Sequence, residues 1–193
     1  MVAELRIVDG MTNLTAANQL TLFRLLLVPA LVLLVLYGFN GWAFLAFAVA
    51  GITDALDGLI ARRTGQRTRL GALLDPMADK LLLTSTFVVL TMPLGLPNQF
   101  PLWFTITVIS RDVLIVVTVA IVNLAVGRRI FYPSVFGKLA TLCYVVTGGM
   151  ALFFNYLDRS SNVLQLGIYA SLLLTVISGL HYIVHATRIV NDD

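Results

Sequence analysis

Four aspartates that lie between two long apolar runs are the residues of this sequence whose type and spacing could do chemistry. They fall in the pattern D-x2-D-G-x2-A-R-x8-G-x3-D-x3-D, and they are Asp54, Asp57, Asp75 and Asp79. Residues three or four apart share one face of a helix, so each pair of aspartates should lie on a single face. Two helices joined by a short basic loop would therefore present four carboxylates toward each other.

A divalent-cation site is the simplest explanation for such an arrangement. Unpaired carboxylates would repel one another, and cations between them would remove that cost. Acidic residues at a helix end are often only solvated, but Asp75 and Asp79 lie inside an apolar run. A charge there costs about 2.5–3.5 kcal/mol on membrane-insertion scales. Hard oxygen ligands of this kind favour magnesium.

The composition identifies the class of protein that carries this pattern. The chain has 193 residues, of which 59% are hydrophobic and 12% charged, and its mean hydropathy is +0.91. These values indicate an integral membrane protein. The single cysteine, Cys143, excludes an internal disulfide and forms no zinc motif. No Lys/Arg-rich arm suggests a nucleic-acid partner.

The apolar runs predict an all-α fold with six transmembrane helices in one domain over residues 1–193. Residues 1–19 are expected to form a juxtamembrane segment, whose opening residues are either a short amphipathic helix or a flexible tail. Residues 20–188 form the six-helix bundle. Each run is long enough for the roughly 20 residues that cross a bilayer. The predicted spans are Leu20–Phe39, Trp42–Arg62, Leu70–Met92, Leu102–Val126, Ser134–Phe154 and Val163–Arg188.

Basic residues predict the orientation of the spans. They gather at alternate ends, at Arg6, Arg24, Arg62, Arg63, Arg67, Arg69, Arg128, Arg129, Lys138 and Arg188, whereas the opposite loops contain only Arg159. The positive-inside rule then places both termini and the aspartates on the cytoplasmic side of the inner membrane.

The aspartate pattern, with every position filled, resembles the signature of the CDP-alcohol phosphotransferase family. This resemblance implies transfer of a phosphatidyl or similar group from a CDP-linked donor, such as CDP-diacylglycerol, to an alcohol, with release of CMP. It also implies two divalent ions, Mg²⁺ or Mn²⁺, and a homodimer that is embedded in membrane lipids.

The same resemblance implies roles for individual residues. Asp54, Asp57 and Asp75 correspond to metal ligands, and Asp79 corresponds to a ligand that is also the general base for the acceptor hydroxyl. Small residues would let the nucleotide approach the helix backbone, and an arginine can pair with a phosphate. The donor-binding set is Asp57, Gly58, Ala61, Arg62 and Gly71.

The acceptor site is predicted from the remaining cations. Glycerol 3-phosphate would bring a phosphate, and the candidates to bind it are Arg111, Lys138 and Lys80. Arg111 lies inside the fourth span, where a charge needs a partner or a ligand. An ion pair with Asp112 is the alternative, although adjacent helical residues point about 100° apart.

Within the family, the sequence looks most like members that transfer to glycerol 3-phosphate. An aspartate directly after Arg111, however, is closer to members that transfer to phosphatidylglycerol, which makes that lipid the alternative acceptor. A different class, an ion-coupled transporter, would also carry intramembrane carboxylates. It would be expected to spread them over several helices in two related halves, and no repeat is evident. Intramembrane prenyltransferases use aspartate motifs with other spacings.

Other conspicuous residues receive structural interpretations. His181 and His185 are four apart on the last span but lack a third ligand nearby in sequence, so packing is favoured over metal binding. Gly148 and Gly149 are expected to permit close helix contact. Five aromatic residues are expected to anchor the membrane interfaces, namely Tyr37, Trp42, Trp103, Tyr132 and Tyr156.

Overall fold

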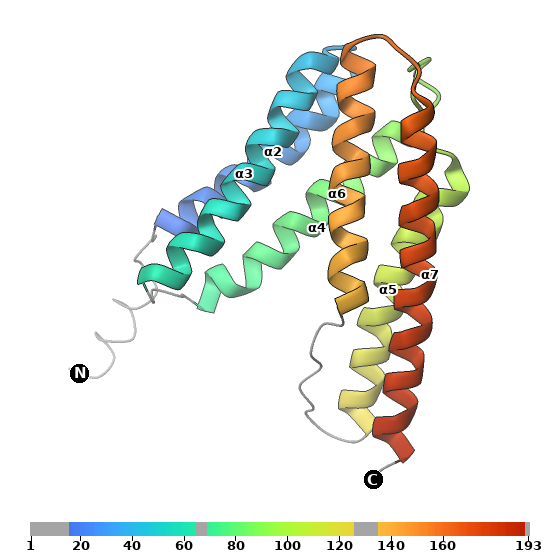
Figure 1. Ribbon diagram of the computed structural model, residues 1–193. Coiled ribbons are helices and arrows are strands. Elements are labelled where there is room, and N and C mark those ends of the chain that lie inside the picture. The colour runs from blue at the N-terminus through green and yellow to red at the C-terminus, as the bar shows by residue number, and fades with distance from the viewer. Residues whose placement is uncertain (1–15, 65–68, 126–134, 192–193) are drawn as a thin grey trace, which may run out of the picture.

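The computed structural model describes residues 16–64, 69–125 and 135–191, and within these ranges all regular secondary structure is α-helical (Figure 1). The predicted all-α fold is confirmed. The helices are α2 Ala16–Leu36, α3 Asn40–Thr64, α4 Arg69–Thr91, α5 Leu102–Ala125, α6 Val135–Tyr156 and α7 Asn162–Asn191. Each corresponds to one predicted span, whereas the predicted amphipathic stretch near the N-terminus lies outside the described residues.

The first helix ends three residues earlier than predicted, at Leu36. Gly38 has a φ of 78°, its N–H bonds to the Val35 carbonyl at 3.0 Å, and the Phe39 N–H bonds to the Leu34 carbonyl at 2.8 Å. These are the two hydrogen bonds of a Schellman motif, which ends a helix with one residue in the left-handed region. Hydropathy alone does not reveal this stop, because Tyr37 and Phe39 continue the apolar run.

The same motif closes α6, but with aspartate instead of glycine. Asp158 has a φ of 51°, its N–H bonds to the Asn155 carbonyl at 3.2 Å, and the Arg159 N–H bonds to the Phe154 carbonyl at 3.1 Å. A residue with a Cβ is strained in this conformation, although aspartate tolerates it better than most.

The helices form two groups that diverge toward one end of the molecule, as Figure 1 shows. α2 packs on both α3 and α4, while α7 packs on both α5 and α6. The groups meet where α6 contacts α3 and α4, and where α4 contacts α5. α4 therefore belongs to both groups, and it separates from the α5–α7 group toward its own N-terminal end.

Buried residues recur every three or four positions along the helices, which is the spacing of one helical face. On α7 the buried stripe holds Leu164, Ile168, Ser171, Thr175, Ser178 and Tyr182. The core centres on Phe87 of α4, whose ring lies 5.0 Å from Phe100 and 5.5 Å from Phe104, centroid to centroid. Gly148 makes room for it, since a Cβ there would lie 3.4 Å from the Phe87 ring. This contact agrees with the packing role predicted for that glycine.

Four of the described helices, α2, α5, α6 and α7, are long and apolar enough to cross a membrane. In α3 the apolar stretch is shorter and covers Asn40–Leu56. The acidic and basic residues of α3 and α4 interrupt their apolar runs at one end, which is where the two helix groups diverge. The chain is a membrane protein whose polar residues are concentrated at that end.

The opposite end of the bundle is fastened by side-chain amides. Asn155 of α6 accepts a hydrogen bond from the backbone N–H of Asn98 at 2.9 Å and returns one to its carbonyl at 3.1 Å. The Asn98 amide also donates to the Arg159 carbonyl at 2.7 Å. Both asparagines are buried. These bonds join the α4–α5 connection to the α6–α7 connection.

Candidate active site

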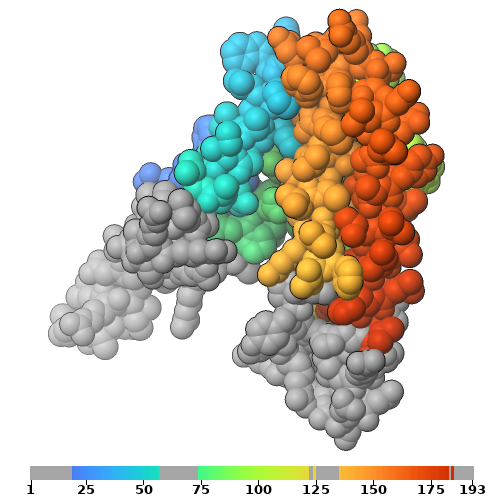
Figure 2. Space-filling model, viewed as in Figure 1, coloured from blue at the N-terminus to red at the C-terminus, as the bar shows by residue number. Residues whose placement is uncertain are grey.

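A cavity of about 530 Å³ lies between the two helix groups. In the space-filling view the surface is hollowed between α3 (cyan) and α6 (orange), with α4 (green) visible at the back (Figure 2). The helices α3 to α7 all contribute to it. Its lining residues are Asp54, Asp79, Lys80, Arg111, Ile115, Gly137, Lys138, Thr141, Leu142, Val145 and Tyr182.

A smaller cavity of about 150 Å³ continues from it toward the core. It shares Asp79, Lys80, Arg111 and Thr141 with the larger cavity and reaches Phe87. The site therefore narrows from a wide mouth to an apolar floor, with charged groups at the transition. A third cavity, at the opposite end of the bundle, has Asp158 as its only charged lining residue. The predicted site residues that line a cavity therefore lie at the Asp79 end.

Asp54 and Asp79 form the acidic side of the cavity. Asp54 follows Phe47 and Ala50 on the buried stripe of α3, and Asp79 precedes Leu83 and Phe87 on that of α4. Helical spacing thus carries the core stripe of each helix directly into a carboxylate at the polar end. The structure brings together these two predicted ligands.

Asp75 has a different neighbour. It lies one turn before Asp79 on α4, and its carboxylate accepts a hydrogen bond from the buried hydroxyl of Thr21 on α2. The side chain of Asp57 lies outside the described residues. Among the side chains that the structure describes, no group of three His, Cys, Asp or Glu residues is close enough to hold a metal ion.

Asp54 already has a cation of the protein as its partner. Arg24 of α2 places Nη1 2.7 Å from Asp54 Oδ1, with an arginine side chain that is 0% exposed and an aspartate that is 48% exposed. Arg24 and Thr21 lie on the same face of α2 as Leu31 and Val35, all of them buried. Sequence reasoning missed both residues, although their spacing from those two core residues was a signal that could have found them.

Three cations line the same cavity. They are Lys80 of α4, Arg111 of α5 and Lys138 of α6, so the structure brings the three predicted acceptor residues together. A cavity with both carboxylates and cations suits a ligand that carries both a metal-binding phosphate and a free anionic group.

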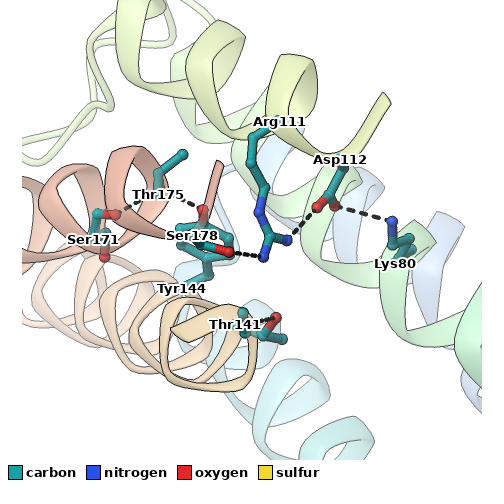
Figure 3. A network of polar contacts seen from close by, with 9 residues as sticks. Lys80, Arg111, Asp112, Thr141, Tyr144, Ser171, Thr175 and Ser178 are labelled. Atoms are coloured by element: carbon teal, nitrogen blue, oxygen red, sulfur yellow. Dashed lines mark hydrogen bonds and ion pairs between the residues drawn. The ribbon is translucent and has the colours of Figure 1, made fainter. Parts of the chain in front are cut away.

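Arg111 is held in place by two oxygen atoms (Figure 3). Its Nη1 lies 2.8 Å from Asp112 Oδ1, and its Nη2 donates to Ser178 Oγ at 2.7 Å. Asp112 also lies 3.5 Å from Lys80 Nζ. The expectation that Arg111 and Asp112 face apart is therefore wrong, because the long arginine side chain folds back along α5. The sequence contained no local signal for Ser178, which lies 67 residues away.

The predicted donor-binding residues lie where α3 ends and α4 begins. Gly58, Ala61 and Arg62 belong to the last turns of α3, and Gly71 to the first turn of α4. Their side chains, like that of Asp57, lie outside the described residues, and their role stays a prediction.

Several other predicted features lie away from the cavity. His181 is exposed, and its ring lies 5.5 Å from that of Phe136, which fits the packing interpretation. The side chain of His185 and the whole of Tyr132 lie outside what the structure describes. The other predicted interfacial anchors have exposed rings, namely Tyr37, Trp42, Trp103 and Tyr156.

The donor set of the acidic side fits a hard divalent cation. Asp54 and Asp79 offer only oxygen atoms, and no softer ligand, thiol or imidazole, lines the cavity within the described residues. Oxygen-only coordination by carboxylates is the preference of Mg²⁺ and Mn²⁺.

Comparison with known proteins shows the family of the chain. A sequence model of the CDP-alcohol phosphatidyltransferase family matches residues 14–179, and the chain belongs to this family. The matched region contains all four signature aspartates and Arg111. Because the family is one of transferases, it also decides against the alternative of a transporter.

The names of individual relatives are of two kinds, those of glycerol-3-phosphate or phosphatidylglycerophosphate enzymes and those of cardiolipin synthases. The chain is 39% identical over 182 residues to the "Probable phosphatidylglycerophosphate synthase" of Mycobacterium tuberculosis, with 89% of this chain and 81% of the relative covered. It is 31% identical over 172 residues to the "CDP-diacylglycerol–glycerol-3-phosphate 3-phosphatidyltransferase" of Haemophilus influenzae, covering 85% and 89%. It is 41% identical over 138 residues to the "Cardiolipin synthase (CMP-forming)" of Streptomyces coelicolor, covering 66% and 60%.

Proposed function

We propose that the chain transfers the phosphatidyl group of CDP-diacylglycerol to glycerol 3-phosphate and releases CMP. The observation that carries this proposal is a single cavity lined by two carboxylates and three cations, namely Asp54, Asp79, Lys80, Arg111 and Lys138. A donor with a pyrophosphate and an acceptor with its own phosphate need these two kinds of surface. The relatives from M. tuberculosis and H. influenzae support it, since most of each is covered.

The acceptor phosphate would bind the basic side. Arg111 offers a planar fork of N–H donors that matches a phosphate, and Lys138 adds a second charge at the mouth of the cavity. The charge of Lys80 is already partly balanced, because its Nζ lies 3.5 Å from Asp112 Oδ2. Binding there would direct the acceptor hydroxyl toward the acidic side.

Asp79 would act as the general base, because it lies where the wide cavity meets the narrow one. The hydroxyl oxygen bonds to the phosphorus that carries diacylglycerol, the bond from that phosphorus to the bridging oxygen of CMP breaks, and Asp79 takes the hydroxyl proton. An alcohol is a weak nucleophile at neutral pH, and such a base contributes about 10²–10⁴-fold in rate.

Two divalent cations, Mg²⁺ or Mn²⁺, would be held by Asp54, Asp57, Asp75 and Asp79. When bound, they neutralise the phosphate oxygens and the departing CMP. Asp57, Gly58, Ala61, Arg62 and Gly71 would bind the nucleotide at the α3–α4 end.

Transfer to phosphatidylglycerol, which makes cardiolipin, is the second candidate. Asp112 favours it, because an acidic partner reduces the charge that Lys80 and Arg111 offer to a free phosphate. The Streptomyces relative bears that name, but this chain covers only 60% of it.

The decisive experiment measures CMP release by the purified protein from CDP-diacylglycerol, with glycerol 3-phosphate and phosphatidylglycerol in parallel and the lipid product identified. We expect turnover with glycerol 3-phosphate. Good turnover with phosphatidylglycerol beside none with glycerol 3-phosphate would assign the second candidate.

We also propose that the chain works as a single domain in a homodimer of the inner membrane, with its termini and active site in the cytoplasm. Basic residues at the cavity end support that orientation. A Cys143→Ser protein carrying Asp158→Cys should react with a membrane-impermeant thiol reagent added outside intact cells.

Light scattering in detergent measures the oligomeric state.

A further inference from the structure

Ser178 of α7 is the buried partner of Arg111, a largely buried cation that lines the cavity. It is 1% exposed, and it accepts the 2.7 Å hydrogen bond from Arg111 Nη2, while Arg111 itself is 11% exposed. The two residues come from different helices, and α7 packs directly on α5. Figure 3 shows the guanidinium between the two helices, with Asp112 on its other side.

The two terminal nitrogens of Arg111 contact different acceptors, and this affects how far the charge of the guanidinium is neutralised. An arginine beside a carboxylate favours two parallel hydrogen bonds, which bring the charges together most completely. Here Asp112 accepts a hydrogen bond from Nη1, and the neutral hydroxyl of Ser178 accepts one from Nη2. Ser178 thus prevents the guanidinium from turning fully onto Asp112, and the cation stays directed at the cavity.

Arg111 also retains unused donors. A guanidinium has five N–H groups, and the two contacts engage one on each terminal nitrogen. Among the described residues no atom accepts a hydrogen bond from Nε, which is itself buried. A buried donor without a partner in the protein is a place where a ligand is expected.

We propose that Ser178 is a positioning residue that sets the affinity for the anionic group of the acceptor by holding Arg111 toward the cavity. The inference rests on the proposed function only in that the acceptor carries a phosphate. It adds a residue on α7 to the candidate acceptor site, whose predicted residues come from α4, α5 and α6.

The test compares apparent KM values for acceptor and donor. Ser178→Ala should raise the KM for glycerol 3-phosphate about tenfold, the effect of losing one hydrogen bond to a charged group. The KM for CDP-diacylglycerol should stay within about twofold. Ser178→Thr retains the hydroxyl and should restore acceptor affinity. Ser171→Ala removes a buried hydroxyl two turns away on the same helix, one that bonds to Thr147, and it should leave both constants near the wild type.

A double-mutant cycle separates positioning from general packing. In an Arg111→Gln background, Ser178→Ala should cause no further loss of kcat/KM for the acceptor, because both changes act through the same guanidinium. If Ser178→Ala is not recovered folded, Ser178→Cys keeps the volume but supplies only a weak acceptor, and the same rise is expected.

The outcomes are distinct from those that test the proposed function. A wild-type protein that uses phosphatidylglycerol and not glycerol 3-phosphate overturns the proposed acceptor, and the same variants are then measured with phosphatidylglycerol, whose phosphate is also anionic. An acceptor-selective rise in either assay supports the role of Ser178. Unchanged acceptor KM, or an equal rise for donor and acceptor, overturns it.

Discussion

Arg24 of α2 and Asp54 of α3 form an ion pair of 2.7 Å, and the arginine is completely buried. The acidic side of the cavity is therefore already partly balanced by a cation from the first described helix. Because α2 also supplies Thr21 to Asp75, one face of this helix orients carboxylates on both α3 and α4.

Replacing Arg24 by Gln should destabilise the protein and reduce turnover. The change removes the partner of Asp54, and we expect a loss of about 1–3 kcal/mol, below the values for fully buried pairs because Asp54 is half exposed. Thermal unfolding in detergent measures the stability, and CMP release measures the turnover. Arg159→Gln, an exposed arginine at the other end, should be nearly neutral. Equal melting temperatures for the two variants would contradict this role of Arg24.

Activity should disappear with a chelator and return with Mg²⁺ or Mn²⁺. Asp54 and Asp79 line one cavity with oxygen donors only, and Arg24 neutralises one of the two charges. The pyrophosphate of the donor brings more negative charge, which only added cations can balance. The assay is CMP release across a metal titration. Turnover that persists in excess chelator would exclude the two-metal proposal.

Asp79→Asn should abolish turnover while metal-dependent binding of the CDP donor is largely retained. Asparagine keeps the size and one oxygen, but it does not accept the proton at neutral pH. Asp54→Asn and Asp75→Asn should weaken both binding and turnover. Donor titration in magnesium is compared with the CMP-release rate for each variant. Near-normal turnover of Asp79→Asn would assign the base to another group, and a binding loss as large as that of Asp54→Asn would make Asp79 mainly a metal ligand.

Neutralising Arg111 or Lys138 should selectively weaken acceptor binding. Each loses a charged contact worth about 1.5–3 kcal/mol in a partly dry pocket, so Arg111→Gln and Lys138→Gln should raise the KM for glycerol 3-phosphate much more than that for CDP-diacylglycerol. Lys80→Gln should have a smaller effect, since Asp112 already faces that lysine. Equal changes for both substrates would favour the phosphatidylglycerol alternative.

Asp158→Gly should stabilise the protein. The residue has a φ of 51° at the end of α6, where glycine avoids a penalty of about 1 kcal/mol. A rise in the unfolding temperature is expected, and Asp158→Ala, which keeps the Cβ and loses the polar side chain, should lower it. No change in either variant would mean that the turn is not strained.

The sequence was enough to predict the six helices and the two acidic positions, Asp54 and Asp79, that line the cavity. Hydrophobic runs mark the helices, and intervals of three or four residues place the aspartates of each helix on one face. Contacts between distant segments were not predictable in this way. Thr21 and Asp75 are 54 residues apart, and Arg111 and Ser178 are 67 apart. Which residues meet there depends on how the helices pack, which a single sequence does not specify.

The direction of Asp75 illustrates the same limit. Its position on α4 suggested that it faces the other carboxylates. Instead, its carboxylate accepts a hydrogen bond from a hydroxyl on α2. Periodicity defines a face of the helix, whereas the rotamer depends on the partner that a neighbouring helix offers.

Hydrogen bonds between Asn98 and Asn155 hold one end of the bundle together. They fasten the connections at one end, while the cavity opens between the helices at the other. The 22 residues of α6 form a lever about 33 Å long. A tilt of about 5° at the fastened end would therefore displace the cavity end by about 3 Å, as large as a hydrogen-bond length. A rotation of this size about the two buried asparagines would therefore change the width of the cavity mouth by about one hydrogen-bond length.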